Sequence, residues 1–292
     1  SSSLNNNNRF NWFNREGFMK PIQLFKTLAV GVTAVGVLAA TPALAQNKDY
    51  ILNTASTGGT YHPVGTAIAT LSKVKLLPKQ KFSLTAVNSA GSGANVQALG
   101  ADTAQFAIIQ GLFGSYAATG TGPVTAPQTN MRSVSMLWQN VEQFVVANQY
   151  AKTGTAADLV AMKGMTMGFG KQNSGTIGSN RVLLKGLGLD MAKDFKLMHG
   201  GYGPTADALA NGQVAGIGAP SGPPTGAITK LMASNAAKFT MLTVTPDEAK
   251  KMDGGRNLWV PYTIKAGTYP GQTKDLLTIA QPNFLAVNAD VS

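Results

Sequence analysis

Three turns rich in serine, threonine and glycine hold the residues best suited to bind a ligand. They are residues 56–65 (STGGTYHPVG), 88–95 (NSAGSGAN) and 170–176 (GKQNSGT), and each lies between an apolar, strand-like run and a helical pattern. A helix start offers unpaired N–H groups at the positive end of the helix dipole, and hydroxyls add donors. One such turn often does no more than cap a helix. Their repetition, with Gln110 at the end of a further strand, predicts a site for a small anion such as a carboxylate.

Residue types that perform acid–base, nucleophilic or metal chemistry are scarce. The chain has no cysteine and two histidines, His62 and His199, and no serine stands in a G-x-S-x-G motif. No acid lies in the three turns. We therefore predict no catalytic residue, no metal and no cofactor. One alternative stays open, an exported enzyme that acts on a small acid through His62 beside the Thr60 hydroxyl.

Nucleotides and nucleic acids are poor candidates for the ligand. Residues 201–206 (GYGPTA) match the dinucleotide fingerprint loosely, but Pro204 removes an amide and no acid follows about 20 residues later. The net charge is +11, from 24 Lys and Arg against 13 Asp and Glu, yet no basic run with interleaved aromatics occurs. We therefore expect no nucleic-acid partner, and a small anionic solute explains the basic charge more simply.

Strand-like and helical segments alternate along the chain. Val64, Ala67, Ile68 and Leu71 recur at helical spacing, which predicts a helix that ends near residue 74. Strands are predicted at residues 82–87, 105–110, 131–138, 142–148, 165–168, 195–198, 213–218, 239–244, 258–264 and 277–287. Such strand–helix repeats indicate an α/β fold whose mostly parallel sheets bind ligands beyond the carboxyl ends of their strands. Two α/β lobes with a hinge near residues 148–154 are the simplest arrangement.

The N-terminal segment has the features of an export signal. Residues 1–18 are interpreted as a non-native or overextended N-terminus. Residues 19–45 contain two lysines, an apolar run at 28–40 and the sequence TPALA that ends at Ala45, as in a secretory signal peptide. We therefore expect a periplasmic protein, secreted through a cleaved signal peptide. A membrane anchor is the alternative, but the apolar run is shorter than the roughly 20 residues that span a bilayer.

Several motifs together resemble the TAXI family, the extracytoplasmic solute-binding proteins of tripartite ATP-independent periplasmic (TRAP) transporters. The motifs are STGGTYHPVG at 56–65, S-x-G-S-x-x-N at 89–95, QFAIIQ at 105–110, NSGT at 173–176, AL-x-x-GQ at 208–213 and AGTYPGQ at 266–272. They cover nearly the whole chain after the signal peptide, in order. Departures occur at residues 214–216, where relatives usually carry an acid, and at His62, where a second aromatic residue is common.

This resemblance implies a type II periplasmic-binding-protein fold, with two α/β lobes around a hinge and cleft. It implies capture of a glutamate-like, 2-oxoglutarate-like or dicarboxylate ligand, and delivery to the integral membrane subunits of a TRAP transporter. A binding protein of an ATP-driven importer is the alternative. Carried over by position, the ligand contacts would be Gly58, Gly59, Thr60, Tyr61, Ser89, Ser92, Asn95, Gln110, Ser174, Gly175, Thr176 and Ser221.

The expected domain boundaries follow from these patterns. Lobe 1 is expected at residues 46–148, lobe 2 at 149–265, and a segment that returns to lobe 1 at 266–292. Because the sequence ends directly after a strand-like run, we also expect C-terminal truncation.

Overall fold

The computed structural model describes residues 46–291. The described residues belong to the compact unit that begins at residue 45. The predicted signal peptide at 19–45 lies outside the described residues. Within the described part of the chain, no helix combines the length and the apolar composition that a membrane span requires.

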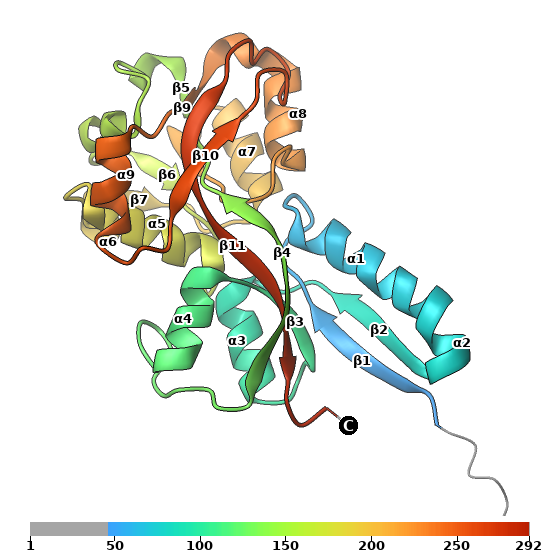
Figure 1. Ribbon diagram of the computed structural model, residues 1–292. Helices are drawn as coiled ribbons and strands as arrows, with labels where there is room; N and C mark the ends of the chain where they lie inside the picture. The colour runs from blue at the N-terminus through green and yellow to red at the C-terminus, as the bar shows by residue number, and fades with distance from the viewer. Residues whose placement is uncertain (1–45, 292) are drawn as a thin grey trace, which may run out of the picture. The chain divides into compact units, whose positions relative to one another are not determined.

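The first sheet has six strands in the order β10-β11-β3-β1-β2, with β4 paired to β11 as well (Figure 1). Its strands are β1 (Lys48–Asn53), β2 (Phe82–Val87), β3 (Phe106–Gln110), β4 (Met131–Val141), β10 (Val260–Ile264) and β11 (Leu276–Asn288). β1 runs parallel to β2 and β3, whereas β11 runs antiparallel to its neighbours. All five residues of β3 are buried, as expected of a central strand with helices on both faces.

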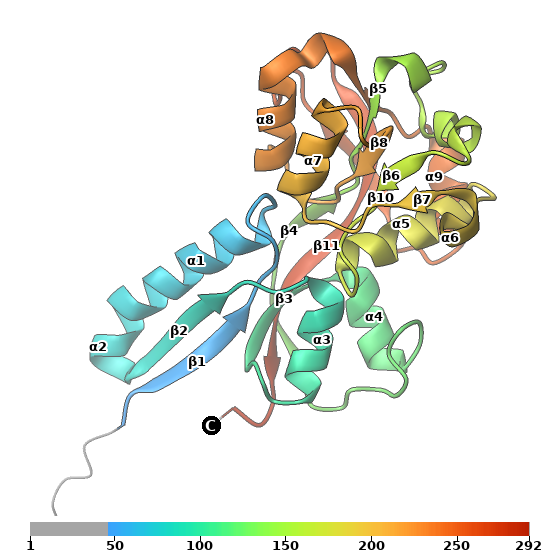
Figure 2. The same cartoon turned by 180° about the vertical axis from the view of Figure 1, so that it is seen from behind.

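Four α-helices belong to this first lobe. They are α1 (Tyr61–Leu71), which continues through a π-helical segment (Ser72–Leu76) into α2 (Leu77–Gln80), α3 (Ser92–Gly100) and α4 (Gly111–Thr119). Figures 1 and 2 show α1 along β1 and β2, with α3 and α4 beside the other strands. The predicted helix is present, but its predicted end near residue 74 is too early, because a π-helical segment at Ser72–Leu76 leads on into α2, which ends at Gln80.

The second sheet has five strands in the order β7-β6-β8-β5-β9. They are β5 (Phe144–Ala147), β6 (Thr166–Gly168), β7 (Lys196–Leu197), β8 (Gly216–Gly218) and β9 (Phe239–Leu242). The α-helices of this lobe are α5 (Gly175–Gly186), α6 (Met191–Asp194), α7 (Tyr202–Ala210), α8 (Gly226–Asn235) and α9 (Pro246–Asp253). Short 3₁₀ segments occur at Asn148–Tyr150, Ala156–Met162 and Ala236–Lys238.

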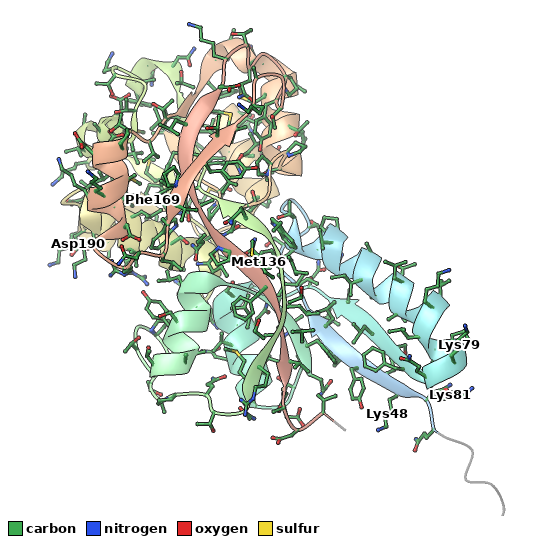
Figure 3. All side chains as sticks on the ribbon, viewed as in Figure 1. Lys48, Lys79, Lys81, Met136, Phe169 and Asp190 are labelled. Atoms are coloured by element: carbon green, nitrogen blue, oxygen red, sulfur yellow. The ribbon has the colours of Figure 1, made fainter. Side chains whose placement is uncertain are left out.

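The core of the second lobe packs apolar side chains from several of these elements together. Phe169, which is 1% exposed, lies inside this lobe (Figure 3), and its ring meets that of Phe195 edge to face at a centroid distance of 5.4 Å. Leu183 from α5 and Met167 from β6 belong to the same buried cluster. This packing fixes the helices whose first residues face the site described below.

The chain passes between the two sheets twice. It crosses at residues 142–143, between β4 and β5, and again between β9 and β10. The expected boundaries at residues 148 and 265 lie a few residues after these crossings, so that β5 belongs to the second sheet and β10 to the first. The hinge near residues 148–154 stays a prediction.

Candidate ligand-binding site

Residues from both sheets enclose a cavity of about 40 Å³. The first lobe contributes residues 55, 56, 59–61, 90–92, 110 and 140, and the second contributes 171, 174–176, 200–202, 220 and 221. One buried water needs roughly 10–15 Å³ on this scale. The cavity therefore holds only a few heavy atoms in this closed arrangement of the lobes.

Five helix N-termini converge on this cavity. The residues that precede α1, α3, α4, α5 and α7, namely Thr60, Gly91, Gln110, Ser174 and Gly201, all line it. The first turn of a helix has N–H groups without intrahelical partners, and its end carries partial positive charge. The cavity therefore lies where the positive ends of helices from both lobes meet.

Two glycines allow the backbone of the two lobes to approach closely here. Gly91 has a φ of +118°, which residues with side chains rarely adopt. A Cβ atom on Gly175 would lie 2.5 Å from the Gln110 Oε1 atom and 2.8 Å from the Ser92 Oγ atom. The glycine at the start of α5 thus lets the first-lobe side chains reach that helix.

Lys171 gives the cavity a positive charge. Among the described residues that line the cavity it alone is charged, and it is exposed to solvent at the cavity edge. No carboxylate lines the cavity in the described part of the chain. The electrostatic balance therefore favours an anion over a cation.

Two tyrosines supply neutral phenol groups to the lining. Burial raises the pKa of both Tyr61 and Tyr202 well above its usual range, so that both keep their protons. Tyr61 donates to the Asn283 Oδ1 atom over 2.5 Å, and Tyr202 donates to the Pro220 carbonyl over 2.5 Å. Thr176 lies 2.7 Å from the Tyr202 hydroxyl. These bonds hold both rings in place against the cavity.

The structure brings together most of the predicted site residues. Nine of the twelve line the cavity: Gly59, Thr60, Tyr61, Ser92, Gln110, Ser174, Gly175, Thr176 and Ser221. The Ser174 hydroxyl accepts from the Ile177 N–H as a helix cap, so that the turn both starts α5 and faces the cavity. Their role as ligand contacts remains a prediction.

Gly58, Ser89 and Asn95 do not line the cavity. Gly58 accepts a bond from the Ala227 N–H through its carbonyl. The Ser89 hydroxyl donates to the Asn95 side chain, and the Asn95 amide donates to the carbonyls of residues 54 and 108. Asn95 is fully buried. In this structure Ser89 and Asn95 shape the turn behind the cavity, because their side chains bond groups of their own lobe, whereas Gly58 bonds the second lobe.

Several lining residues escaped the sequence prediction. Tyr202 and Gly201 were missed because they were weighed only as part of a dinucleotide fingerprint, whereas in the structure α7 begins at Tyr202. Pro204 fits the first turn of that helix, where an N–H has no partner to lose. Lys171 lies within the third predicted turn but was not among the predicted ligand contacts. Asn140, near the end of β4, belongs to no sequence motif that would indicate a ligand contact.

The histidines lie outside the cavity lining. The His62 Nδ1 atom is 3.1 Å from the Thr54 Oγ1 atom, and the His199 Nδ1 atom is 3.4 Å from the Gly170 carbonyl. Residues 46–291 hold no group of three or more His, Asp or Glu side chains placed to bind a metal ion. The donors that line the cavity are main-chain N–H groups, hydroxyls and amides, and neither histidine is among them.

Comparison with known proteins agrees with this architecture. A model of the NMT1-like family matches residues 52–292. A binding protein component of a phosphonate ABC transporter from Pseudomonas aeruginosa is 13% identical with a TM-score of 0.50, and the match covers 85% of this chain and 70% of that one. PhnD1 from Prochlorococcus marinus, in complex with methylphosphonate, is 14% identical with a TM-score of 0.51, at 84% and 78% coverage.

A third structure, the periplasmic aliphatic sulphonate binding protein SsuA from Escherichia coli, is 12% identical with a TM-score of 0.45. The match covers 82% of this chain and 65% of SsuA, so this chain spans just under two thirds of its length. The narrower resemblance to the TAXI family is not shown by these matches and stays a prediction. The chain belongs to the NMT1-like family, and its two α/β lobes have the fold of the periplasmic binding proteins.

Proposed function

We propose that this protein is a periplasmic solute-binding protein that captures a small anionic solute between its lobes and presents it to a membrane transporter. One observation carries the proposal: five helix N-termini and Lys171 face one cavity that no carboxylate lines in the described residues. Main-chain N–H groups and hydroxyls bind an anion reversibly without forming a covalent bond.

Hydrogen bonds between the lobes support capture by closure. The Gly222 N–H donates to the Thr60 Oγ1 atom over 3.1 Å, and the Ala227 N–H donates to the Gly58 carbonyl over 3.1 Å. A ligand that touches both lobes binds the closed form better than the open form, and so shifts the population toward closure. In this proposal, the structure with its small cavity represents the closed form.

The positive charge and the donors of the cavity favour a solute that places an acidic group against them. A carboxylate of the glutamate, 2-oxoglutarate or dicarboxylate type is the first candidate, from the sequence resemblance. A phosphonate is the second, because PhnD1, whose fold this chain shares, was solved with methylphosphonate. Both are small anions that accept several hydrogen bonds, so the same donors suit either.

The transporter partner separates two versions of the proposal. The resemblance to the TAXI family favours the membrane subunits of a TRAP transporter, whereas the Pseudomonas neighbour serves an ABC transporter. Transport assays with membrane vesicles that carry either transporter type would distinguish them. Stimulation of uptake by the loaded protein with ATP absent favours the TRAP partner, and a strict need for ATP favours the ABC partner.

Isothermal titration calorimetry tests the ligand class. The panel is glutamate, 2-oxoglutarate, succinate, methylphosphonate and methanesulfonate, and native mass spectrometry identifies any acid that copurifies. We expect saturable binding by at least one of these anions. Absence of binding by every anion, with no copurified acid, would contradict the proposal.

The enzyme alternative has little support from the geometry. It requires His62 at the cavity, but His62 instead faces Thr54 and does not line the cavity. In a binding protein His62→Gln retains most of the anion affinity. An enzyme that depended on His62 would lose its turnover.

A further inference from the structure

Glu142 is a buried acid at the point where the chain crosses between the lobes. Its side chain is 1% exposed and takes part in no salt bridge among the described residues. The Oε1 atom accepts from the Trp259 indole N–H over 2.8 Å and from the Gln281 amide over 3.3 Å. The Oε2 atom has no hydrogen-bond partner within the described part of the chain. An ionised carboxylate with one oxygen that lacks a hydrogen-bond partner costs far more free energy to bury than the neutral acid does.

A short chain of hydrogen bonds joins Glu142 to the ligand cavity. Gln281 donates to the Ser179 hydroxyl oxygen over 2.9 Å, in addition to its contact with Glu142. Gln110, which lines the cavity, donates to the same Ser179 oxygen over 2.9 Å. The Ser179 hydroxyl is also among the hydrogen-bonding groups that stabilise the charged form of Glu142. Three side chains, Gln281, Ser179 and Gln110, thus connect Glu142 to the cavity.

The surroundings of Glu142 favour its neutral form. Burial raises the pKa of Glu142 to about 7, although hydrogen bonds from Trp259, Gln281 and Ser179 lower it in part. This places its titration near neutral pH, where a small change in the local field alters its protonation.

Each element packed around Glu142 leaves it without a cationic partner. Gln281 from β11 and Ser179 from α5 are uncharged, and the backbone N–H of Trp259 donates to Asp253, an acid. The negative charge of Glu142 repels the ionised forms of Tyr61 in α1 and Tyr202 in α7, and this repulsion helps to raise the pKa of each phenol. The field of an ionised Glu142 therefore reaches two residues that line the cavity.

We propose that the protein takes up one proton at Glu142 when its cavity binds an anion. This inference rests on the proposed function, because it concerns the same cavity. An anion in the cavity and an ionised Glu142 repel each other through a low-dielectric interior, and neutralising Glu142 removes that repulsion. The proton comes from the solvent. Anion and proton then bind as a linked pair.

The sign of the resulting pH dependence follows from linkage. The bound anion raises the proton affinity of Glu142, so the complex holds more protons than the free protein near and above neutral pH. Well below pH 7 the acid is neutral in both states and the linkage vanishes. Above pH 7, the affinity for the anion falls as pH rises, by at most about tenfold per pH unit when one proton is taken up.

Calorimetry measures this proton directly. The probe is whichever of 2-oxoglutarate, succinate and methanesulfonate binds the wild-type protein most tightly, since none of the three changes its own charge between about pH 6.5 and 8.5. Titrations in two buffers of different ionisation enthalpy at about pH 7.5 give the number of protons taken up. We expect an uptake between about 0.3 and 1 proton, and an affinity that falls between about pH 6.5 and 8.5.

Two variants assign the proton to its residue. Glu142→Gln keeps the shape and an acceptor for Trp259 but cannot titrate, so we expect no proton uptake and a flat pH profile. Glu248→Gln is the matched control, because Glu248 has a lowered pKa and stays ionised over this range. The Glu248→Gln variant should retain the wild-type proton uptake and the wild-type dependence of affinity on pH.

The outcomes are distinguishable. Binding without proton uptake by the wild-type protein overturns this inference and leaves the proposed function intact, and so does a Glu142→Gln variant that keeps the wild-type pH slope. Failure of all five anions of the panel to bind, with no copurified acid, overturns both. If Glu142→Gln does not fold, the buffer comparison on the wild-type protein still decides whether a proton is taken up.

Discussion

The Gln110 side chain of the first lobe donates a hydrogen bond to the Gly175 carbonyl of the second lobe over 3.1 Å. The same amide donates to the Ser179 hydroxyl oxygen, and Asn140 donates to the Gln110 Oε1 atom over 3.3 Å. Gln110 is 2% exposed, and it stands between the end of β3 and the start of α4. One buried side chain thus joins both lobes at the wall of the cavity.

Replacing Gln110 by alanine should weaken both folding and binding. The change leaves the Asn140 amide without its Gln110 partner, at a cost on the order of 1–3 kcal/mol for an unsatisfied buried group. We expect a loss of that size in the free energy of unfolding by urea denaturation, and about a tenfold loss of anion affinity by calorimetry. Gln213→Ala, at an exposed position, is the control and should change neither. Wild-type affinity in Gln110→Ala would show that the lobes close without this residue.

Replacing Gly175 by alanine should hinder closure. The added methyl group would lie 2.5 Å from the Gln110 Oε1 atom and 2.8 Å from the Ser92 Oγ atom, so the lobes cannot come together as they do here. We expect at least a tenfold loss of affinity and a larger radius of gyration by small-angle X-ray scattering in the presence of ligand. Gly203→Ala is the matched control, because its methyl group would meet no atom within 4 Å. Equal affinities in the two variants would rule out the steric explanation.

Replacing Lys171 by glutamine should weaken anion binding modestly. Lys171 is exposed, so solvent screens its charge and we expect about a two- to fivefold loss of affinity, which added salt diminishes in the wild-type protein. The neighbouring Gln172→Ala leaves the charge in place and serves as the control. The account is contradicted if the Lys171 variant binds anions more tightly than the wild-type protein does.

Asp253 should make the second lobe sensitive to acid. Its carboxylate accepts from the N–H groups of Asn257, Leu258 and Trp259 at 2.8 to 3.1 Å, and these backbone bonds lower its pKa. Because the folded-state pKa lies below the unfolded value, the stabilisation is present above the unfolded pKa and is lost as pH falls through the folded one.

Urea denaturation at about pH 7, 5 and 3 measures this contribution. Asp253→Asn should lower the free energy of unfolding on the order of 1–2 kcal/mol at pH 7 and reduce the loss on acidification. The exposed Asp207, which pairs with Lys230 at 2.9 Å, provides Asp207→Asn as the control, and that variant should have nearly the wild-type profile. An unchanged acid profile in Asp253→Asn would assign the sensitivity to other acids.

Features encoded in short segments could be predicted from the sequence. Thr60, Ser92 and Ser174 lie at turns whose glycines and hydroxyl residues start a helix, and the structure places all three at the cavity. The strand at residues 105–110 is β3, and Gln110 lies at its carboxyl end. In each case the local chemistry of a strand end or helix start determines the position.

Features that depend on tertiary structure could not be predicted in this way. Asn140 lines the cavity because β4 pairs with β11, which lies far away in the sequence. The residues near Asn140 do not indicate that pairing. Ser89 and Asn95 share a motif with Ser92, yet their side chains satisfy backbone groups behind the cavity. The burial of Glu142 likewise arises only when Trp259 and Gln281 pack around it.

The most direct test of the central claim compares an acid with its neutral counterpart. Calorimetry with the tightest-binding carboxylate or phosphonate, and with the corresponding amide or neutral ester, isolates the charge while keeping the shape similar. If helix N-termini and Lys171 hold the ligand, the anion binds at least a hundredfold more tightly than its neutral counterpart, on the order of 3 kcal/mol. Equal affinity for the two, or tighter binding of the neutral compound, would contradict the account.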